Sequence, residues 1–451
     1  MPAPRTESGF SHTVVIPSRD RPESLRATLR SLDENAARFG RKIDVVVLND
    51  SSPKNASKYG PVVTAKFRAL KVIHVSSDSV AKMASDAGLT NLAEKRWETD
   101  YGKVRTLGLF FAVERMRKSA GNRWDPSRHL ITFIDDDVRV EVPKVGGDSL
   151  VHTASLNADF IGCIEEPFAD GQVGICGSSY LIDRGAHSEA VGAALGHVVG
   201  IADNLGIFTH GLPPRQAREF GQLVKFHLSK ARDNHVFFPL GASYSLKGQS
   251  SLTQPGYISP DGRISISGGN MSIRAAYALS SRPFIRGPSR GDDVVYREYA
   301  VRSAWKVFDH GINLVHIHAG GGGNIVEPEL GDLAGGAVLE HLGLARNEFE
   351  VLRSEFQYRA QMSQPLVPAL MSALSHCAAA GQQNRVVRSA LEEVGEVQRQ
   401  LSSIASLTHP YNRGNLLATR PISDVPRILS DFEADQQQWR GYCQRITLKP
   451  V

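Results

Sequence analysis

Residues 129–140 read His-Leu-Ile-Thr-Phe-Ile-Asp-Asp-Asp-Val-Arg-Val. Residues 130–134 are mostly apolar and rich in β-branched and aromatic side chains, which predicts a buried strand. Asp135, Asp136 and Asp137 follow directly, and unpaired charges are too costly to bury inside a sheet. We therefore expect them at the carboxyl end of the strand. There they would either bind a hard divalent cation or form a solvated acidic turn.

A strand–helix–strand unit precedes this stretch. Residues 13–17 and 43–48 are short apolar runs that predict two strands, and residues 22–32 between them have the leucine spacing of a helix that begins at a proline. Such a unit places its two strands parallel and side by side. Residues 71–75 predict a third strand, and residues 102–113 predict a helix that leads into the acidic strand.

Polar side chains follow these strands where each one ends. Arg19 and Arg21 come after the first strand, and Asp50 comes after the second. Ligands bind parallel sheets beyond the carboxyl ends of their strands, so a binding site is expected at this edge, although such residues are also ordinary turn formers. Neither a GxGxxG motif nor a P-loop follows the first strand, which disfavours dinucleotide binding and P-loop chemistry.

The series Val-Val-Ile-Pro-Ser-Arg-Asp-Arg-Pro-Glu-Ser-Leu, Val-Val-Val-Leu-Asn-Asp-Ser-Ser and Phe-Ile-Asp-Asp-Asp resembles the family 2 glycosyltransferases. The resemblance implies an α/β protein with the GT-A fold, a Rossmann-like mixed, mainly parallel sheet flanked by helices. It also implies a nucleotide-sugar donor and a DXD-type metal motif in residues 135–137. In the nucleotide-binding half, the resemblance implies that Pro17, Arg19 and Arg21 contact the nucleotide, that Asp50 contacts the base, and that Arg105 contacts the base or the diphosphate. It also implies that Asp136 binds the ribose and Asp137 binds the metal. Asp135 would bind either the ribose or the metal.

Three further segments carry candidate site residues. Gly268, Gly269 and Asn270 form a strand–turn pattern that the resemblance places under the donor sugar, although the pattern is also common in purely structural turns. Asp292 and Asp293 lie at an expected helix start, where one aspartate would suffice as a cap. The resemblance makes one of them the general base, and we favour Asp293.

The third segment is the expected strand 314–318, which carries His316 and His318 on one face. Imidazole is a common ligand of transition metals, and a half-buried structural pair is the alternative. The resemblance implies one metal-binding histidine here, and we favour His318 over His316. The implied cofactor is a divalent metal, Mn²⁺ or Mg²⁺.

Composition limits the class of protein. The chain has 451 residues, a net charge of +5 and 41% hydrophobic residues, which describes a globular protein without the basic clusters typical of nucleic-acid binding. Four widely spaced cysteines predict a reducing compartment, and the N-terminal residues lack a signal-peptide pattern. No run is long and apolar enough to span a bilayer. We therefore expect a cytoplasmic protein without a membrane span.

Two domains are expected from the length. Residues 1–325 would form the GT-A domain, with a nucleotide-binding half at about 10–140 and an acceptor half at about 141–325. Residues 326–451 have helical spacing and would form a C-terminal helical region that packs on the first domain, mediates self-association as a homo-oligomer, or holds an acceptor. The motifs do not identify the acceptor among glycans, lipid-linked molecules and small molecules.

The sequence thus predicts an inverting, metal-dependent glycosyltransferase. It would move a sugar from a UDP, dTDP or GDP sugar to an acceptor hydroxyl. The alternative is a catalytically inert GT-A-like scaffold that binds nucleotide sugars without turning them over.

Overall fold

The computed structural model describes nine ranges of the chain: 9–94, 101–144, 152–183, 252–258, 266–281, 296–297, 299–300, 303–317 and 416–448. Asp292, Asp293 and His318 lie outside the described residues. So do residues 326–415, which make up most of the expected C-terminal helical region. The domain boundary at residue 325 therefore stays a prediction.

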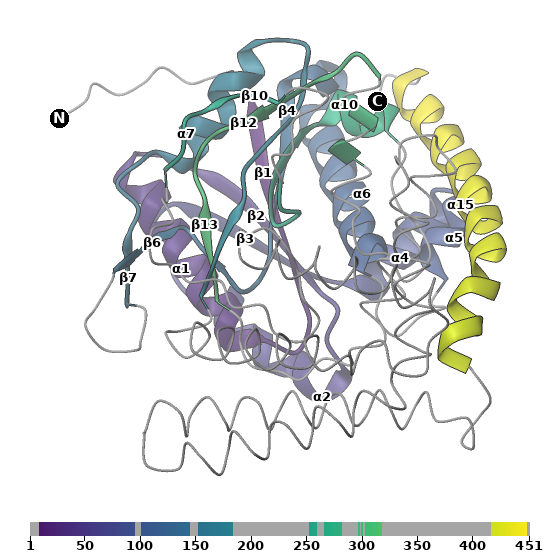
Figure 1. Cartoon of the computed structure of the whole chain (residues 1–451), viewed down its shortest axis with the longest axis horizontal. Coiled ribbons are helices and arrows are strands. Elements are labelled where there is room, and N and C mark those ends of the chain that lie inside the picture. Colours follow the sequence, from purple (N-terminus) through teal and green to yellow (C-terminus); the bar gives the residue numbers. More distant parts are fainter. Residues whose placement is uncertain are drawn as a thin grey trace, which may run out of the picture.

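A central sheet organises the described part (Figure 1). Its eight strands lie in the order β10-β12-β8-β11-β4-β1-β2-β3. Strands β3, β2, β1 and β4 are parallel, β11 runs antiparallel between β4 and β8, and β12 pairs parallel with β8. The strand bounds are β1 Ser11–Ser18, β2 Ile43–Asn49, β3 Leu70–Ser76, β4 His129–Ile134, β8 Val173–Gly177, β10 Gly256–Tyr257, β11 Asn270–Arg274 and β12 Lys306–Asp309.

Helices cover both faces of this sheet, as Figure 1 shows. Along β1, Val15 packs in the core shared with helices α4, α5, α6, α10 and α15, whereas Val14 and Ile16 pack on the other face against α1, α3 and α7. This alternation follows from the two-residue period of a strand. The helix bounds are α1 Pro22–Arg38, α2 Pro53–Ala56, α3 Gly60–Val63, α4 Ser77–Asp86, α5 Thr90–Ala93, α6 Tyr101–Ala120, α7 Phe160–Glu165, α10 Ala275–Ser280 and α15 Leu416–Leu448.

These elements confirm the predicted fold class, a mixed and mainly parallel sheet flanked by helices with a helical C-terminal segment. Helix α1 begins at the expected proline, and Leu25, Leu29 and Leu32 are fully buried against the sheet. Residues 161–163 form a short apolar run that would predict a strand from the sequence, but this prediction is wrong, because these residues belong to α7. Asp159 caps that helix by accepting a hydrogen bond from the Gly162 amide, which starts a helical turn instead of a strand.

Two smaller sheets lie beside the carboxyl ends of the main strands. One consists of β5 Val138–Arg139, β13 Leu314–Ile317 and β9 Tyr180–Asp183, in that order. The other pairs β6 Glu141–Lys144 with β7 His152–Ser155. Because β5 begins directly after the three aspartates, the first small sheet brings β13 and β9 next to them.

The C-terminal helix α15 packs on the same core as α4, α5 and α6. Trp439 is fully buried there, and the Tyr442 hydroxyl donates to Glu114 Oε1 on α6 at 2.8 Å. Asn91 of α5 donates to Asp435 Oδ1 at 2.8 Å. Residues more than 300 positions apart in the chain therefore share one hydrophobic core. Within the described residues, none of the helices is long and apolar enough to cross a membrane.

Candidate functional site

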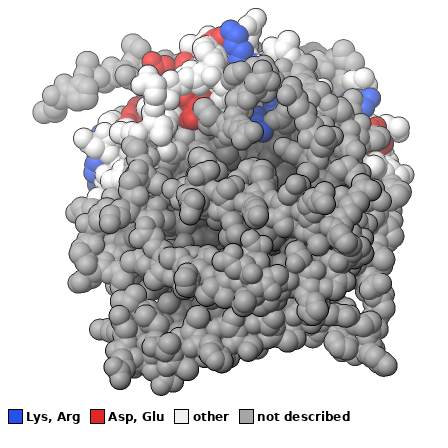
Figure 2. Space-filling view, viewed as in Figure 1, with Lys and Arg blue, Asp and Glu red and all other residues white. Residues whose placement is uncertain are grey.

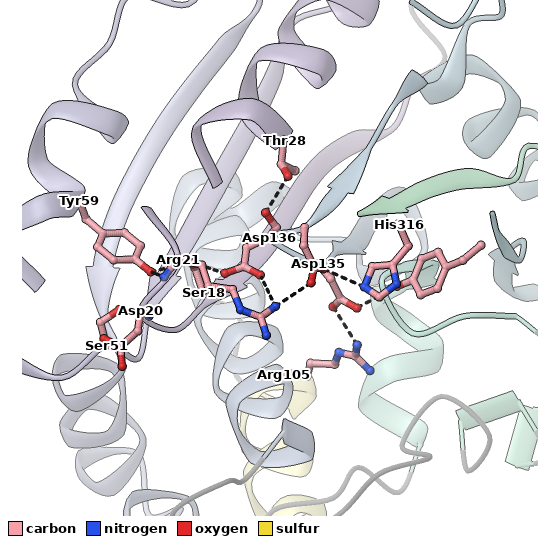
Figure 3. A network of polar contacts seen from close by, with 12 residues as sticks. Ser18, Asp20, Arg21, Thr28, Ser51, Tyr59, Arg105, Asp135, Asp136 and His316 are labelled. Carbon is pink, nitrogen blue, oxygen red and sulfur yellow. Dashed lines mark hydrogen bonds and ion pairs between the residues drawn. The ribbon is translucent and has the colours of Figure 1, made fainter. Parts of the chain in front are cut away.

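The three aspartates that follow β4 lie at the carboxyl edge of the sheet, as the sequence predicts. Figure 3 shows Asp135 and Asp136 between Arg21 on one side and His316 on the other. Each carboxylate has a different set of partners, drawn from segments far apart in the chain. Acidic and basic side chains also lie near one another along the upper edge of the face in Figure 2.

Asp137 contacts two of the predicted residues. Its Oδ2 accepts a hydrogen bond from Arg21 Nη1 at 2.6 Å, and its Oδ1 lies 3.0 Å from His316 Nε2. The Asp137 side chain is only 5% exposed, so both contacts lie in a largely water-excluded place. Burial opposes protonation of His316, but the contact with Asp137 outweighs it and raises the His316 pKa above its usual value.

Asp135 has a separate pair of partners. Arg105 Nη2 donates to its Oδ1 at 2.9 Å, and the Tyr180 hydroxyl donates to its Oδ2 at 2.8 Å. Burial opposes ionisation of Asp135, but the charge and hydrogen bond of Arg105 outweigh burial and hold its pKa below the usual range. Asp135 is therefore an anion at neutral pH with an arginine beside it.

Asp136 is turned toward the β1–α1 loop. Its Oδ2 accepts a hydrogen bond from the Ser18 hydroxyl at 2.6 Å, and its backbone carbonyl accepts one from Thr28 at 2.8 Å. Burial raises the pKa of Asp136 to about 7, and the charges of Asp137 and Asp135 add to this effect against the hydrogen bond from Ser18. Asp135 and Asp136 therefore have pKa values shifted in opposite directions, although they are adjacent in sequence.

The β1–α1 loop that carries Arg19 and Arg21 is tied to the loop after β2. Asp20 has a positive φ of 57°, and its Oδ1 accepts hydrogen bonds from Ser52 and Asn55. Its backbone amide donates to Ser51 Oγ at 2.8 Å. These contacts hold the two loops together at the edge of the sheet.

Asp50 and Pro17 lie on the nucleotide side proposed from the sequence. Pro17 is a residue of β1 and pairs with Leu48 of β2. Asp50 follows β2, and its Oδ1 accepts a hydrogen bond from Ser77, the first residue of α4, at 2.6 Å. Asp50 is half-buried, and its backbone amide donates to the carbonyl of Ser18 at 2.9 Å, next to the network around the three aspartates. Its role as the base contact stays a prediction.

The two glycines of the 268–270 segment lie against protein side chains. A Cβ atom at Gly268 would overlap the Arg105 guanidinium, and one at Gly269 would overlap the Tyr180 hydroxyl and the Asp135 carboxylate. The resemblance to family 2 glycosyltransferases places these glycines under the donor sugar. In the structure, their small size admits Arg105 and Tyr180, the two partners of Asp135.

Asn270 lies inside the protein, with 1% of its surface exposed. Its amide nitrogen donates to the carbonyls of Ser179 at 3.1 Å and Ile312 at 2.9 Å. Those residues precede β9 and β13, so Asn270 fastens together the starts of two strands. The donor contact expected for Asn270 stays a prediction, and the structure gives the residue a bracing contact that sequence reasoning did not anticipate.

The residues present fit a divalent cation. Two ligands at right angles on an octahedral ion, each about 2.0–2.1 Å from it, are about 2.9 Å apart. Asp137 Oδ1 and His316 Nε2 are hydrogen-bonded at 3.0 Å, so the two atoms are close enough for one ion to bind both in place of the shared proton. Among the described residues, no group of three or more histidines, cysteines and carboxylates is arranged to hold a metal. A site of this kind therefore needs ligands from a substrate, as is usual for Mg²⁺ bound with phosphates.

Sequence reasoning missed four residues of this network: Ser18, Thr28, Tyr59 and Tyr180. The Tyr59 hydroxyl lies 2.8 Å from Ser18 Oγ and accepts from the Arg21 amide at 3.0 Å. Ser18 ends β1 inside the quoted motif, and Tyr59 lies in a short 3₁₀ helix, but neither residue type by itself indicates a contact with the acidic cluster. Only their proximity to the aspartates identifies them.

Comparisons with known proteins give distant likenesses only. No family model matches the chain, and no curated protein does. A crystal structure of a mycobacterial protein aligns with a TM-score of 0.35 and 13% identity, over 75% of this chain and 77% of that one. The crystal structure of S. aureus TarS aligns with a TM-score of 0.34 and 13% identity over 93% of this chain. The match spans 55% of the TarS chain. At this level of similarity no function transfers from either protein.

Proposed function

We propose that this protein is a glycosyltransferase that moves a sugar from a nucleoside diphosphate sugar to an acceptor hydroxyl. The observation that carries the proposal is the meeting of Arg21, Asp137 and His316 at the carboxyl edge of the sheet. They come from the β1–α1 loop, the end of β4 and β13. A carboxylate, an imidazole and a guanidinium at one point are suited to a diphosphate and its counter-cation.

The donor would lie along the edge from β4 to β2. Parallel strands are about 4.8 Å apart, so the ends of β4 and β2, two strands apart, are separated by about 10 Å. That span suits a nucleotide with its diphosphate near Asp137 and its base near Asp50. Arg21 and Arg105 would then turn their charge to the phosphate oxygens, with Arg19 and Pro17 beside them and Asp136 near the ribose.

Asp137 and His316 would hold the Mn²⁺ or Mg²⁺ ion, with His318 as the alternative histidine ligand. When bound, such an ion offsets the charge that grows on the diphosphate leaving group. Arg21 lies on the other oxygen of Asp137 and would contribute positive charge at the same point. The bases of the uridine, thymidine and guanosine diphosphate sugars all carry a ring N–H, and Asp50 would accept a hydrogen bond from it.

The acceptor would be activated by Asp293, with Asp292 as its neighbour. The acceptor hydroxyl gives its proton to the Asp293 carboxylate while its oxygen attacks the anomeric carbon. The bond from that carbon to the diphosphate oxygen breaks at the same time, and the nucleoside diphosphate leaves. A single displacement of this kind inverts the anomeric configuration.

Thermal shift with a panel of nucleotide sugars tests the donor site directly. Ligand binding raises stability with the logarithm of concentration over affinity. A preferred donor in Mn²⁺ or Mg²⁺, with the shift reduced by a chelator, would support the proposal. Asp137→Asn should weaken this binding and abolish transfer. A matched control is Asp44→Asn at the amino end of β2, where Asp44 pairs with Arg115 on the surface.

The general base is tested by Asp293→Asn, which should abolish transfer while donor binding stays at the wild-type level. Full transfer activity in this variant would refute the assignment of Asp293 as the general base. Wild-type activity unaffected by a strong chelator would exclude a metal ion from the mechanism. Donor binding by the wild-type chain with neither transfer nor slow donor hydrolysis would instead favour the inert scaffold.

A further inference from the structure

Tyr180 lies between the two halves of the acidic cluster. Its hydroxyl donates to Asp135 Oδ2 at 2.8 Å, and its ring stacks on the His316 imidazole, with centroids 5.0 Å apart and planes 19° from parallel. His316 in turn lies against Asp137. One side chain therefore contacts Asp135, the partner of Arg105, on one side and His316, the partner of Asp137, on the other.

The backbone around Tyr180 explains this placement. Strand β9 runs parallel to β13, with Tyr180 opposite Leu314 and Ile182 opposite His316. Strand β5, directly after Asp137, pairs with β13 on its other side. The small sheet thus holds the tyrosine, the histidine and the end of the acidic segment in one register, and the Asn270 amide fastens the start of both β9 and β13.

We propose that Tyr180 is a positioning residue that fixes the His316 imidazole for metal coordination. The inference rests on the proposed function, because it takes His316 as a ligand of the cation. A histidine ring turns freely about two side-chain bonds unless neighbours restrain it, and ordered neighbours of metal ligands strengthen binding. The stacked phenol restrains the ring, and its hydrogen bond to Asp135 restrains the phenol.

A space-filling role alone does not account for these contacts. Burial raises the pKa of Tyr180 well above its usual value, so the hydroxyl keeps the proton that it donates to Asp135. Gly269 leaves room for that hydroxyl, since a Cβ atom there would overlap it. Ring and hydroxyl therefore have separate contacts, and two substitutions separate them: Tyr180→Phe keeps the ring and removes the hydroxyl, whereas Tyr180→Leu removes both.

The experiment measures Mn²⁺ bound to the full chain in the presence of UDP. Electron paramagnetic resonance of free Mn²⁺ gives the affinity, and pulsed measurements detect coupling of bound Mn²⁺ to an imidazole nitrogen. Wild type should show the coupling, and His316→Ala should lose it. Tyr180→Leu should bind Mn²⁺ about 10- to 100-fold more weakly with diminished nitrogen coupling, and Tyr180→Phe about tenfold more weakly with the coupling retained.

Tyr257 on the edge strand β10 provides a matched control. Its hydroxyl also donates a hydrogen bond to a carboxylate, that of Asp170, at 3.1 Å. Tyr257→Phe and Tyr257→Leu should leave Mn²⁺ binding unchanged. Thermal unfolding of every variant checks that it folds.

The outcomes separate this inference from the proposed function. If the wild-type chain shows no nitrogen coupling, or if the coupling survives His316→Ala, then His316 is not a ligand of the metal. Either result overturns the inference and the proposed role of His316. Wild-type affinity in Tyr180→Phe together with undiminished coupling in Tyr180→Leu overturns the inference alone. If Tyr180→Leu does not fold, wild-type affinity in Tyr180→Phe overturns it without the second variant.

Discussion

Replacing Gly269 by alanine perturbs the acidic cluster from outside the charged residues. The added Cβ atom would lie 2.5 Å from Asp135 Oδ2 and would overlap the Tyr180 hydroxyl, whereas real Cβ contacts stay beyond 3.0 Å. Gly269 does not have a positive φ, so the backbone itself accepts alanine without strain. The change therefore acts through space alone, and both Tyr180 and Asp135 have to move by at least half an ångström.

The expected cost follows from these contacts. Loss of the hydrogen bond from Tyr180 to the Asp135 carboxylate costs about 1.5–3 kcal/mol, and overpacking costs about 1–3 kcal/mol. Alanine lowers the conformational entropy of the unfolded chain relative to glycine, which stabilises the folded state by about 0.4–1 kcal/mol. The net destabilisation is roughly 2–5 kcal/mol, which urea unfolding resolves as a lower midpoint with an unchanged slope. The displaced phenol should also weaken Mn²⁺ binding.

Gly171→Ala is the matched control. Nothing lies within 4 Å of a Cβ atom at Gly171, and its φ is not positive either. This variant should be as stable as wild type or slightly more stable, by up to about 1 kcal/mol. Equal stability of the Gly269→Ala and Gly171→Ala proteins would refute the packing argument. Full Mn²⁺ affinity in a destabilised Gly269→Ala protein would refute the link from Tyr180 to the metal.

Three further outcomes are expected. Tyr442→Phe removes the hydrogen bond to Glu114 and should lower the free energy of unfolding by about 1.5–3 kcal/mol in a single urea transition; a separate transition for α15 would contradict the shared core. Burial lowers the pKa of His310 from 6.5 to about 3, so its contribution to stability is complete above pH 6.5 and declines as the pH falls toward 3. Wild type should therefore lose about 2 kcal/mol more than His310→Asn between pH 7.5 and pH 5, since asparagine keeps an acceptor for the Ile312 amide. Asn270→Leu leaves two buried carbonyls without their donor and should cost about 2–4 kcal/mol, measured as a lower unfolding midpoint.

The sequence by itself determined the elements of the nucleotide-binding half. The apolar runs at 13–17, 43–48, 71–75 and 130–134 all became strands of the sheet. Strand periodicity and helix spacing are local properties, so a single chain displays them directly. The position of the three aspartates at a strand end was also readable, because the cost of burying charge leaves few other places for them.

The tertiary structure alone decided which groups face one another. Arg21 and Asp137 are 116 residues apart in the chain, and Tyr180 reaches Asp135 from 45 residues away. The amide nitrogen of Asn270 fastens β9 to β13, a contact that the sequence did not predict. Such contacts depend on strand order and register, which follow from packing the whole core. Local patterns specify which segments form strands, but only the assembled sheet brings Arg21, Asp137, His316 and Tyr180 to one edge.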